Sequence, residues 1–170
     1  MPFNLTKKYN DLLDILGMSE GQRTESLRRI FNRDIQDNEH FTFNGKPIYP
    51  TPNEDGEIAM EMLFKHLTRK EVDKETRHRE FDPNRSQRLH WIRHHVEQRK
   101  PDNMLYFSVA EPRANRTYIY DIDEKYVIVL ELRRNGTAYY LLTAYHLEGK
   151  DAARNKILNK YNRRRLPNLL

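Results

Sequence analysis

The spacing of apolar residues along the chain changes near Pro101. Before that point apolar residues recur every three or four positions in four segments, which predicts helices over residues 5–16, 19–37, 57–69 and 83–98. Beyond it the apolar residues alternate with polar ones or form continuous runs, which predicts strands over residues 104–111, 117–122, 126–133 and 138–147. Because the connections between these strands are short, we expect them to form an antiparallel sheet.

Three other segments depart from this division. Residues 41–48 alternate on either side of Asn44-Gly45, which predicts a small hairpin with a type I′ turn. Residues 69–85 are almost entirely charged, so we expect an exposed loop or a solvated extension of the preceding helix. Residues 150–164 return to helical spacing, with Ala153, Ile157 and Tyr161 on one narrow face.

Together these elements predict an α+β fold, in which N-terminal helices pack on a four-stranded antiparallel sheet that is followed by a basic C-terminal helix. A length of 170 residues suits one domain. Within it we expect residues 1–55 to form a helical N-terminal extension with the small hairpin, and residues 56–170 to form the core.

Composition excludes several classes of protein. The chain has no cysteine, which excludes disulfides, cysteine-bearing zinc sites and thiol nucleophiles. Its start lacks a long apolar segment, and no window approaches a membrane span, so we expect a cytoplasmic protein without a membrane partner. With six glycines and no phosphate-cradling glycine-rich loop, we expect no cofactor.

The positive charge is concentrated at the C-terminal end. The chain carries a net charge of +5, yet residues 150–170 alone contain seven basic residues against Asp151. A surplus confined to one helix is typical of phosphate binding, and its alternative is a solvated basic tail. On the first interpretation nucleic acid would contact Arg154, Lys156, Lys160, Arg163 and Arg164.

The segment 83–98 places charge on both sides of one predicted helix. Asp82 is a suitable N-cap, and Leu89, Ile92 and Val96 form an apolar stripe that also includes Arg85, with Arg88 beside it. A guanidinium there needs either an ion pair or an anionic ligand. The opposite face is predicted to hold His90, His94 and Glu97. His90 and Arg93 of this helix could contact nucleic acid. The alternative of a metal site at His90, His94 and Glu97 lacks the spacing of a zinc motif, so we expect no metal.

The last predicted strand carries the side chains of greatest chemical interest. Regular alternation puts Tyr139, Leu141, Thr143 and Tyr145 on one face and Tyr140, Leu142, Ala144 and His146 on the other. The neighbouring hydroxyls of Thr143 and Tyr145 could bind a phosphate, although threonine and tyrosine are also ordinary strand residues. A histidine could act as general acid or base, and the residues alone leave open His66, His90, His94, His95 and His146.

The second half of the chain resembles the phage-associated branch of the barnase/EndoU/colicin/RelE-like nucleases. The resemblance runs from about Phe64 onward and is most specific in Arg85-x-x-Arg88-x-x-Trp91-Ile92 and in Leu142-Thr143-Ala144-Tyr145. It implies helices on a four-stranded antiparallel sheet and a metal-independent ribonuclease of toxin or phage type. It further implies that Thr143 and Tyr145 line the active site, that Arg85 and Arg88 stabilise charge on the phosphate, and that His66 or His90 moves the proton.

The sequence therefore supports three hypotheses of function. The first is an endoribonuclease that cleaves tRNA, mRNA or another structured RNA in the cytoplasm of the producing or infected bacterial cell. The second is a non-catalytic nucleic-acid-binding or phage regulatory module, which would use the same basic helix. The third is an interaction domain whose basic helix binds an acidic antitoxin or immunity protein. The first two predict a salt-dependent affinity for nucleic acid.

Overall fold

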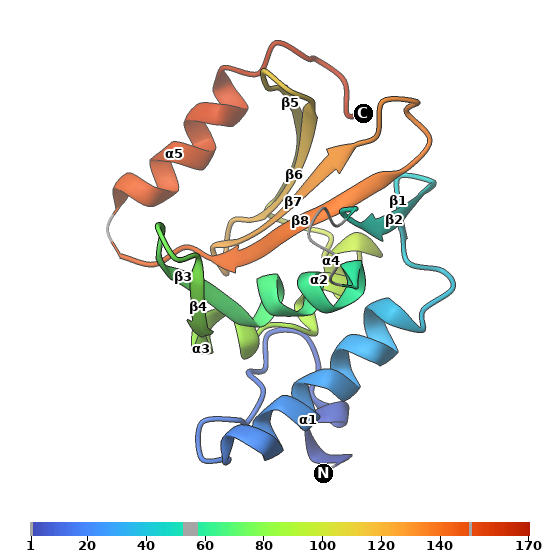
Figure 1. Ribbon diagram of the computed structural model, residues 1–170. Helices are drawn as coiled ribbons and strands as arrows, with labels where there is room; N and C mark the ends of the chain where they lie inside the picture. The colour runs from blue at the N-terminus through green and yellow to red at the C-terminus, as the bar shows by residue number, and fades with distance from the viewer. Residues whose placement is uncertain (1, 53–57, 150) are drawn as a thin grey trace.

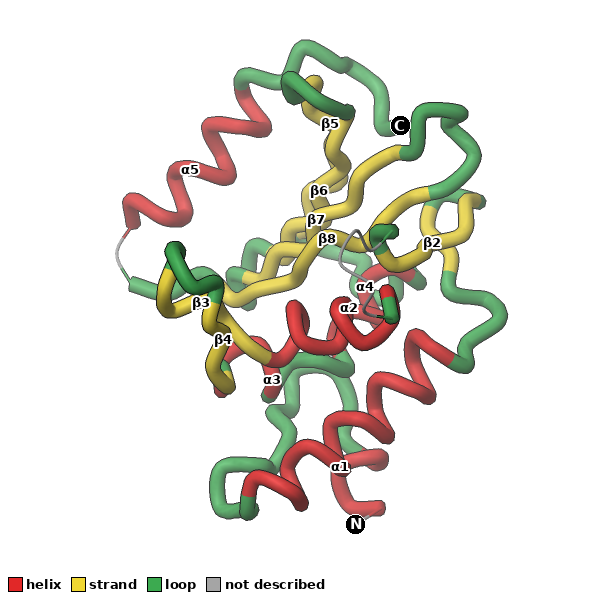
Figure 2. Tube along the Cα trace, in the orientation of Figure 1, coloured by secondary structure: helices red, strands yellow, loops and turns green. Residues whose placement is uncertain are grey.

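The computed structural model describes residues 2–52, 58–149 and 151–170, without the side chains of residues 2 and 151–154. They form an α+β fold built on a curled sheet with the strand order β1-β2-β8-β7-β6-β5 (Figures 1 and 2). The four central and edge strands predicted beyond Pro101 are confirmed as β5 (Met104–Ala110), β6 (Asn115–Asp121), β7 (Tyr126–Leu132) and β8 (Tyr139–His146). All three pairings among them are antiparallel.

The predicted four-stranded antiparallel sheet is nevertheless wrong, because the sheet has six strands and is mixed. The Asn44-Gly45 hairpin forms as predicted, from β1 (Thr42–Phe43) and β2 (Lys46–Pro50), but it joins the main sheet. Its strand β2 pairs in parallel with β8, with Ile48 opposite Tyr139. The hairpin covers the part of the β8 edge from Tyr139 to Leu141, and an open edge leaves backbone groups unpaired.

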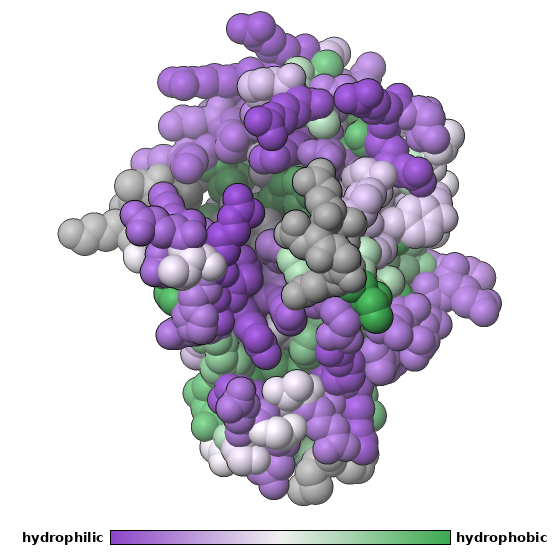
Figure 3. Space-filling view, in the orientation of Figure 1, coloured by the Kyte–Doolittle hydropathy of each residue, from purple (hydrophilic) through white to green (hydrophobic). Residues whose placement is uncertain are grey.

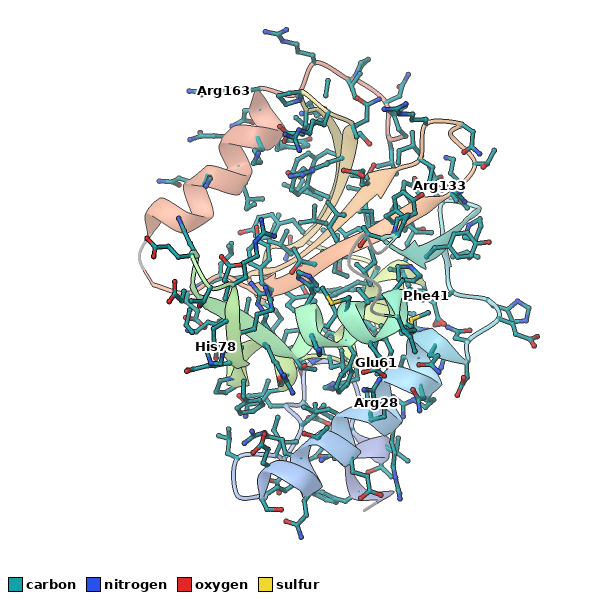
Figure 4. All side chains as sticks on the ribbon, in the orientation of Figure 1. Arg28, Phe41, Glu61, His78, Arg133 and Arg163 are labelled. Carbon is teal, nitrogen blue, oxygen red and sulfur yellow. The ribbon has the colours of Figure 1, made fainter. Side chains whose placement is uncertain are left out.

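The helical regions follow the predicted pattern only in part. Helix α1 (Glu20–Phe31) begins with a capping box at Ser19 and continues as a π-helical turn, Asn32–Gln36. Helix α2 (Ala59–Thr68) lies beside it, and the ion pair between Arg28 Nη2 and Glu61 Oε2, 2.7 Å long, joins the two (Figure 4). Helix α5 (Asp151–Asn162) forms near the C-terminus.

Three predicted elements are corrected. Residues 5–16 are not a helix, because a short 3-10 turn (Pro2–Thr6) leads into a loop and Leu16 stays 64% exposed. The predicted helix over 83–98 consists of two short pieces, α3 (Pro83–Ser86) and α4 (Trp91–Val96). The charged stretch forms a hairpin of β3 (Arg69–Asp73) and β4 (His78–Phe81), whose backbone pairs while most of its side chains remain in water.

Two clusters of buried residues lie on opposite faces of the sheet. The larger one joins the N-terminal segment, α1, α2 and α4 to the face that carries Ile128, Leu130 and Leu141. The smaller one lies between the other face, at Val127 and Val129, and the single buried apolar residue of the described part of α5, Ile157. Figure 1 shows α5 standing over the concave side of the curled sheet, with the other helices on its convex side.

The N-terminal segment is held to the sheet by a buried polar cluster. Asp121, at the end of β6, is completely buried and accepts a hydrogen bond from the hydroxyl of Tyr9. His95 Nε2 lies 3.1 Å from Asp121 Oδ2, and Lys100 Nζ lies 3.3 Å from Oδ1. Several donors therefore converge on one carboxylate, which satisfies a charge that would be costly to bury alone.

Within the described ranges, no helix combines the length and the apolar character needed to cross a membrane.

Candidate active site

A bulge in β8 decides which side chains reach the concave face. Leu141 pairs with Leu130 and Thr143 pairs with Val129, so Leu142 is an extra residue that shifts the register. The prediction that Tyr139 and Leu141 share a face with Thr143 and Tyr145 is therefore wrong. An extra residue reverses the alternation beyond it, so Tyr139 and Leu141 face the helices while Tyr145 packs in the concave cluster.

Arg85 of α3 lies between α2 and the two predicted site residues of β8, Thr143 and Tyr145. Its Nη1 donates to Thr143 Oγ1 at 3.3 Å, and its guanidinium carbon lies 6.0 Å from the centre of the Tyr145 ring. Its Nε forms an ion pair with Asp82 at 3.3 Å, and Asp82 in turn caps α3. The ion-pair interpretation of Arg85 is therefore confirmed, and the same guanidinium also contacts the Thr143 hydroxyl.

His66 lies behind this arginine, near the end of α2. Arg85 Nη1 donates to the backbone carbonyl of His66 at 3.0 Å. Burial, and then the positive charges of Arg79 and Arg85, lower the pKa of the His66 imidazole. A histidine with a lowered pKa is neutral at pH 7 and can accept a proton. The structure thus brings Arg85, Thr143 and Tyr145 together, and it places His66 next to Arg85 through a backbone contact.

Arg79 is a cation next to the site that the sequence did not suggest, and it lines a different cavity together with Arg23 and Phe81. It lies on β4, where its Nη2 donates to the carbonyl of Arg69 at 2.8 Å and its buried Nε has no hydrogen-bond partner among the described residues. The signal that could have found it is alternation within the charged stretch, where Arg79 and Phe81 are the half-buried residues of β4. Arg79 adds a second guanidinium beside Arg85.

A small cavity opens at the C-terminal end of β8. It has a volume of about 190 Å³ and is lined by Lys70, Asp82, Asn84, Arg85, Tyr145, His146 and Glu148. On the face seen in Figure 3 a hollow separates α5 from the β3–β4 hairpin, with apolar residues at its floor and polar residues around it. His146 was left open as an acid or base by the sequence, and here it shares a cavity with Arg85 and Tyr145.

Two further groups in this region have shifted acidity. Burial, and then the charges of Arg88 and Lys125, lower the pKa of His146, so this imidazole is also neutral at pH 7. Burial raises the pKa of the Tyr145 phenol, which therefore stays protonated and able to donate. The cavity accordingly combines a neutral base, a hydroxyl donor and a guanidinium.

Arg88 lies apart from the Arg85 cluster. Its Nη1 donates to the carbonyl of Asn84 at 2.9 Å, and its guanidinium carbon lies 5.3 Å from the Trp91 ring. Its buried Nε has no hydrogen-bond partner among the described residues. Because its charge lowers the pKa of His146, Arg88 lies within electrostatic range of the cavity while not lining it.

Two residues predicted to contact nucleic acid lie elsewhere. His90 is buried, with only 5% of its surface exposed, and its Nε2 lies 3.2 Å from the carbonyl of Lys8, so it does not sit on an exposed helix face. Arg93 forms ion pairs with Glu97 at 2.9 Å and with Asp34 at 3.6 Å. Both line a separate cavity of about 640 Å³ beside the N-terminal segment.

Helix α5 offers fewer free cations than its sequence suggests. Lys160 forms an ion pair with Glu111 at 3.1 Å, and Arg164 lies over the Tyr161 ring at 3.9 Å. Lys156 is exposed, and so is Arg163, which extends outward from the end of α5 (Figure 4). The side chain of Arg154 lies outside the described residues.

Comparisons of the chain with protein-family models, with curated proteins and with solved structures find no match.

Proposed function

We propose that this chain is an endoribonuclease that cleaves RNA through attack of the ribose 2′-hydroxyl on the adjacent phosphorus. The observation that carries the proposal is the contact of Arg85 with Thr143 and its position beside the Tyr145 ring, at the edge of a cavity that a neutral histidine also lines. Phosphoryl transfer needs little covalent chemistry from the protein, so positioned cations and proton carriers can account for catalysis.

The site supplies a group for each step of such a reaction. A neutral imidazole, His66 or His146, accepts the proton of the 2′-hydroxyl as its oxygen bonds to phosphorus. The bond to the 5′ oxygen breaks, and the protonated Tyr145 phenol donates a proton to that leaving oxygen. Arg85 and Arg79 stabilise the negative charge of the phosphorane, while Thr143 orients it. The products are a 2′,3′-cyclic phosphate and a free 5′-hydroxyl.

The proposal draws on the resemblance of the second half of the chain to toxin and phage ribonucleases. It also accords with the surplus of positive charge, which favours a polyanionic substrate. Exposed Lys156 of α5 and Arg163, just beyond this helix, would contact the RNA backbone near the concave face.

The test is cleavage of total RNA and of a defined oligoribonucleotide by the full chain, with EDTA present. Arg85→Gln should reduce the rate by about 100-fold or more, because it removes a donor to the developing charge. Tyr145→Phe should also reduce it, and the products of the unmodified chain should end in 2′,3′-cyclic phosphate. The matched control is Arg29→Gln, which removes an exposed arginine of α1 and should cleave normally.

Replacement of the histidines separates the two bases. If His66 is the base, His66→Gln removes the acidic limb of the pH–rate profile, which lies below pH 6.5 because the pKa is lowered. If His146 is the base, only His146→Gln does so. Binding of RNA without cleavage, or undiminished cleavage by folded Arg85→Gln and Tyr145→Phe variants, would overturn the proposed function.

A further inference from the structure

A second group of cations lies at the opposite end of the same sheet. The β5–β6 and β7–β8 turns meet at this end because antiparallel strands reverse direction at each turn. The two turns and the start of β6 bring four arginines together, which line two adjoining cavities of about 440 and 320 Å³. These arginines are Arg113, Arg116, Arg133 and Arg134.

Few carboxylates neutralise this group. Both cavities are lined by Glu131, whose closest ionic contact is a 3.9 Å approach to Arg116 Nε. Glu111 lies at the rim but is already bound to Lys160. Across the described residues no ion pair involves Arg113, Arg133 or Arg134. The two adjoining cavities, which we call the groove, therefore keep an excess of positive charge that can bind an anion.

The groove has flat aromatic surfaces as well as positive charge, because two tyrosines lie beside the arginines. Tyr49 of β2 lies opposite Tyr140 of β8 in the parallel ladder, and 46% of Tyr49 is exposed. The guanidinium carbon of Arg133 lies 5.9 Å from the Tyr49 ring and 5.5 Å from the Tyr140 ring. Figure 4 shows Arg133 at the end of the sheet that carries β2, far from α5. Aromatic rings interleaved with arginines are typical surfaces for unpaired bases and their phosphates.

The groove lies on the same face of the sheet as Thr143 and Tyr145 of the candidate active site. Tyr140 pairs with Glu131 and Thr143 pairs with Val129, two β7 residues that point to the same side. The bulge at Leu142 is what gives Tyr140 and Thr143 a common face. Because Glu131 and Val129 are two residues apart on β7, roughly 7 Å separate the two positions at about 3.3 Å per strand residue. One extended strand could therefore reach both.

We propose that this groove, defined by Arg113, Arg116, Arg133, Arg134, Tyr49 and Tyr140, binds an unpaired segment of RNA next to the bond that is cleaved. Bases stack on the two tyrosines, and the arginines bind the phosphates between them. The inference rests on the proposed function in that it takes RNA as the substrate. It adds that the substrate is single-stranded at this position, because paired bases cannot stack on protein rings.

The first experiment measures binding independently of cleavage. A fluorescent single-stranded 12-mer with 2′-O-methyl riboses cannot be cut by 2′-hydroxyl attack, so anisotropy reports affinity alone. Tyr49→Leu/Tyr140→Leu should weaken binding at least tenfold. Arg113→Gln/Arg134→Gln should lower the slope of log affinity against log salt by about 0.7 for each lost phosphate contact. Arg29→Gln is the control, and the matching duplex should bind more weakly than the single strand.

The second experiment separates this proposal from the proposed function. The ratio of kcat/KM on a 12-mer to that on a dinucleotide should fall at least tenfold in the tyrosine variant. If the unmodified chain cleaves nothing but its affinity still depends on Tyr49 and Tyr140, the proposed function fails and the groove stands. If Arg85→Gln abolishes cleavage while the groove variants bind and cleave the 12-mer normally, the groove is refuted. The groove proposal would also be refuted if the groove variants lost affinity for an acidic peptide but bound the 12-mer normally.

Discussion

Replacement of Asp121 by asparagine tests whether the buried polar cluster holds the N-terminal segment to the sheet. Burial raises the pKa of Asp121, but contacts from His95, Tyr9 and the Glu124 amide outweigh it and lower the pKa to about 2. The asparagine has the same shape and no charge, and its NH2 group must face at least one of the donors. Removing one partner from a buried ion pair costs about 3–5 kcal/mol.

The lowered pKa also gives the cluster a defined pH dependence. With a folded pKa of about 2 and an ordinary value of 3.8, Asp121 binds its proton more weakly in the folded chain. Its contribution is therefore fully present above about pH 4 and is lost as the pH falls through 2. The difference in pKa corresponds to roughly 2 kcal/mol. Asp121→Asn should lack this part of the acid dependence.

Urea unfolding followed by tryptophan fluorescence measures both effects. Trp91 is the single tryptophan, is 1% exposed and makes edge contacts with Tyr9 and Tyr126 at 5.2 and 5.3 Å between ring centres. Its emission should shift on unfolding. If Asp121→Asn lowers the free energy of unfolding at pH 7 by less than about 1 kcal/mol, the carboxylate is not a required partner of the cluster. The same conclusion follows if the fall in stability between pH 4 and pH 2 is unchanged.

Three further substitutions test separate parts of the fold. Ser19→Ala removes the side-chain half of the capping box and should lower the urea midpoint by the equivalent of about 1 kcal/mol. Gly45→Ala places a side chain at φ +74° with nothing within 4 Å of the new atom, so only backbone strain opposes it, and calorimetry should show a loss of about 1 kcal/mol. Ile157→Ala removes most of the buried side chain that packs α5 on the sheet. Amide hydrogen exchange should therefore become faster in α5 by a larger factor than in β8.

The sequence predicted those strands whose partners are their neighbours in the chain. Strands β5 to β8 pair in sequence order through short turns, so a local pattern contains enough information to place them. The parallel pairing of β2 with β8 joins residues about ninety positions apart, such as Ile48 and Tyr139, and no local signal specifies it. The local pattern therefore predicts the hairpin but not that its two strands belong to the main sheet.

Charged segments were the second source of error. The stretch that forms β3 and β4 has almost no apolar residues, yet its backbone pairs because Arg79 and Phe81 supply an inner face. The helix expected over 83–98 is interrupted by turns at residues 87–90, where His90 Nε2 and Trp91 Nε1 lie 3.2 and 3.1 Å from the backbone carbonyls of Lys8 and Asp11. In each case tertiary contacts of polar side chains replaced the apolar contacts that periodicity detects.

The structure changes the reason why Thr143 and Tyr145 lie on the concave face. Thr143 and Tyr145 do share a face, but regular alternation would have turned them with Tyr139 and Leu141 toward the convex side, where helices fill the space. The bulge at Leu142 reverses the strand at that point. Its effect extends beyond two side chains, because the same reversal gives Tyr140 and Thr143 a common, solvent-accessible side. A bulge of one residue thus connects a cation-rich cavity at one end of β8 to an arginine–tyrosine groove at the other, along a face that α5 only partly occupies.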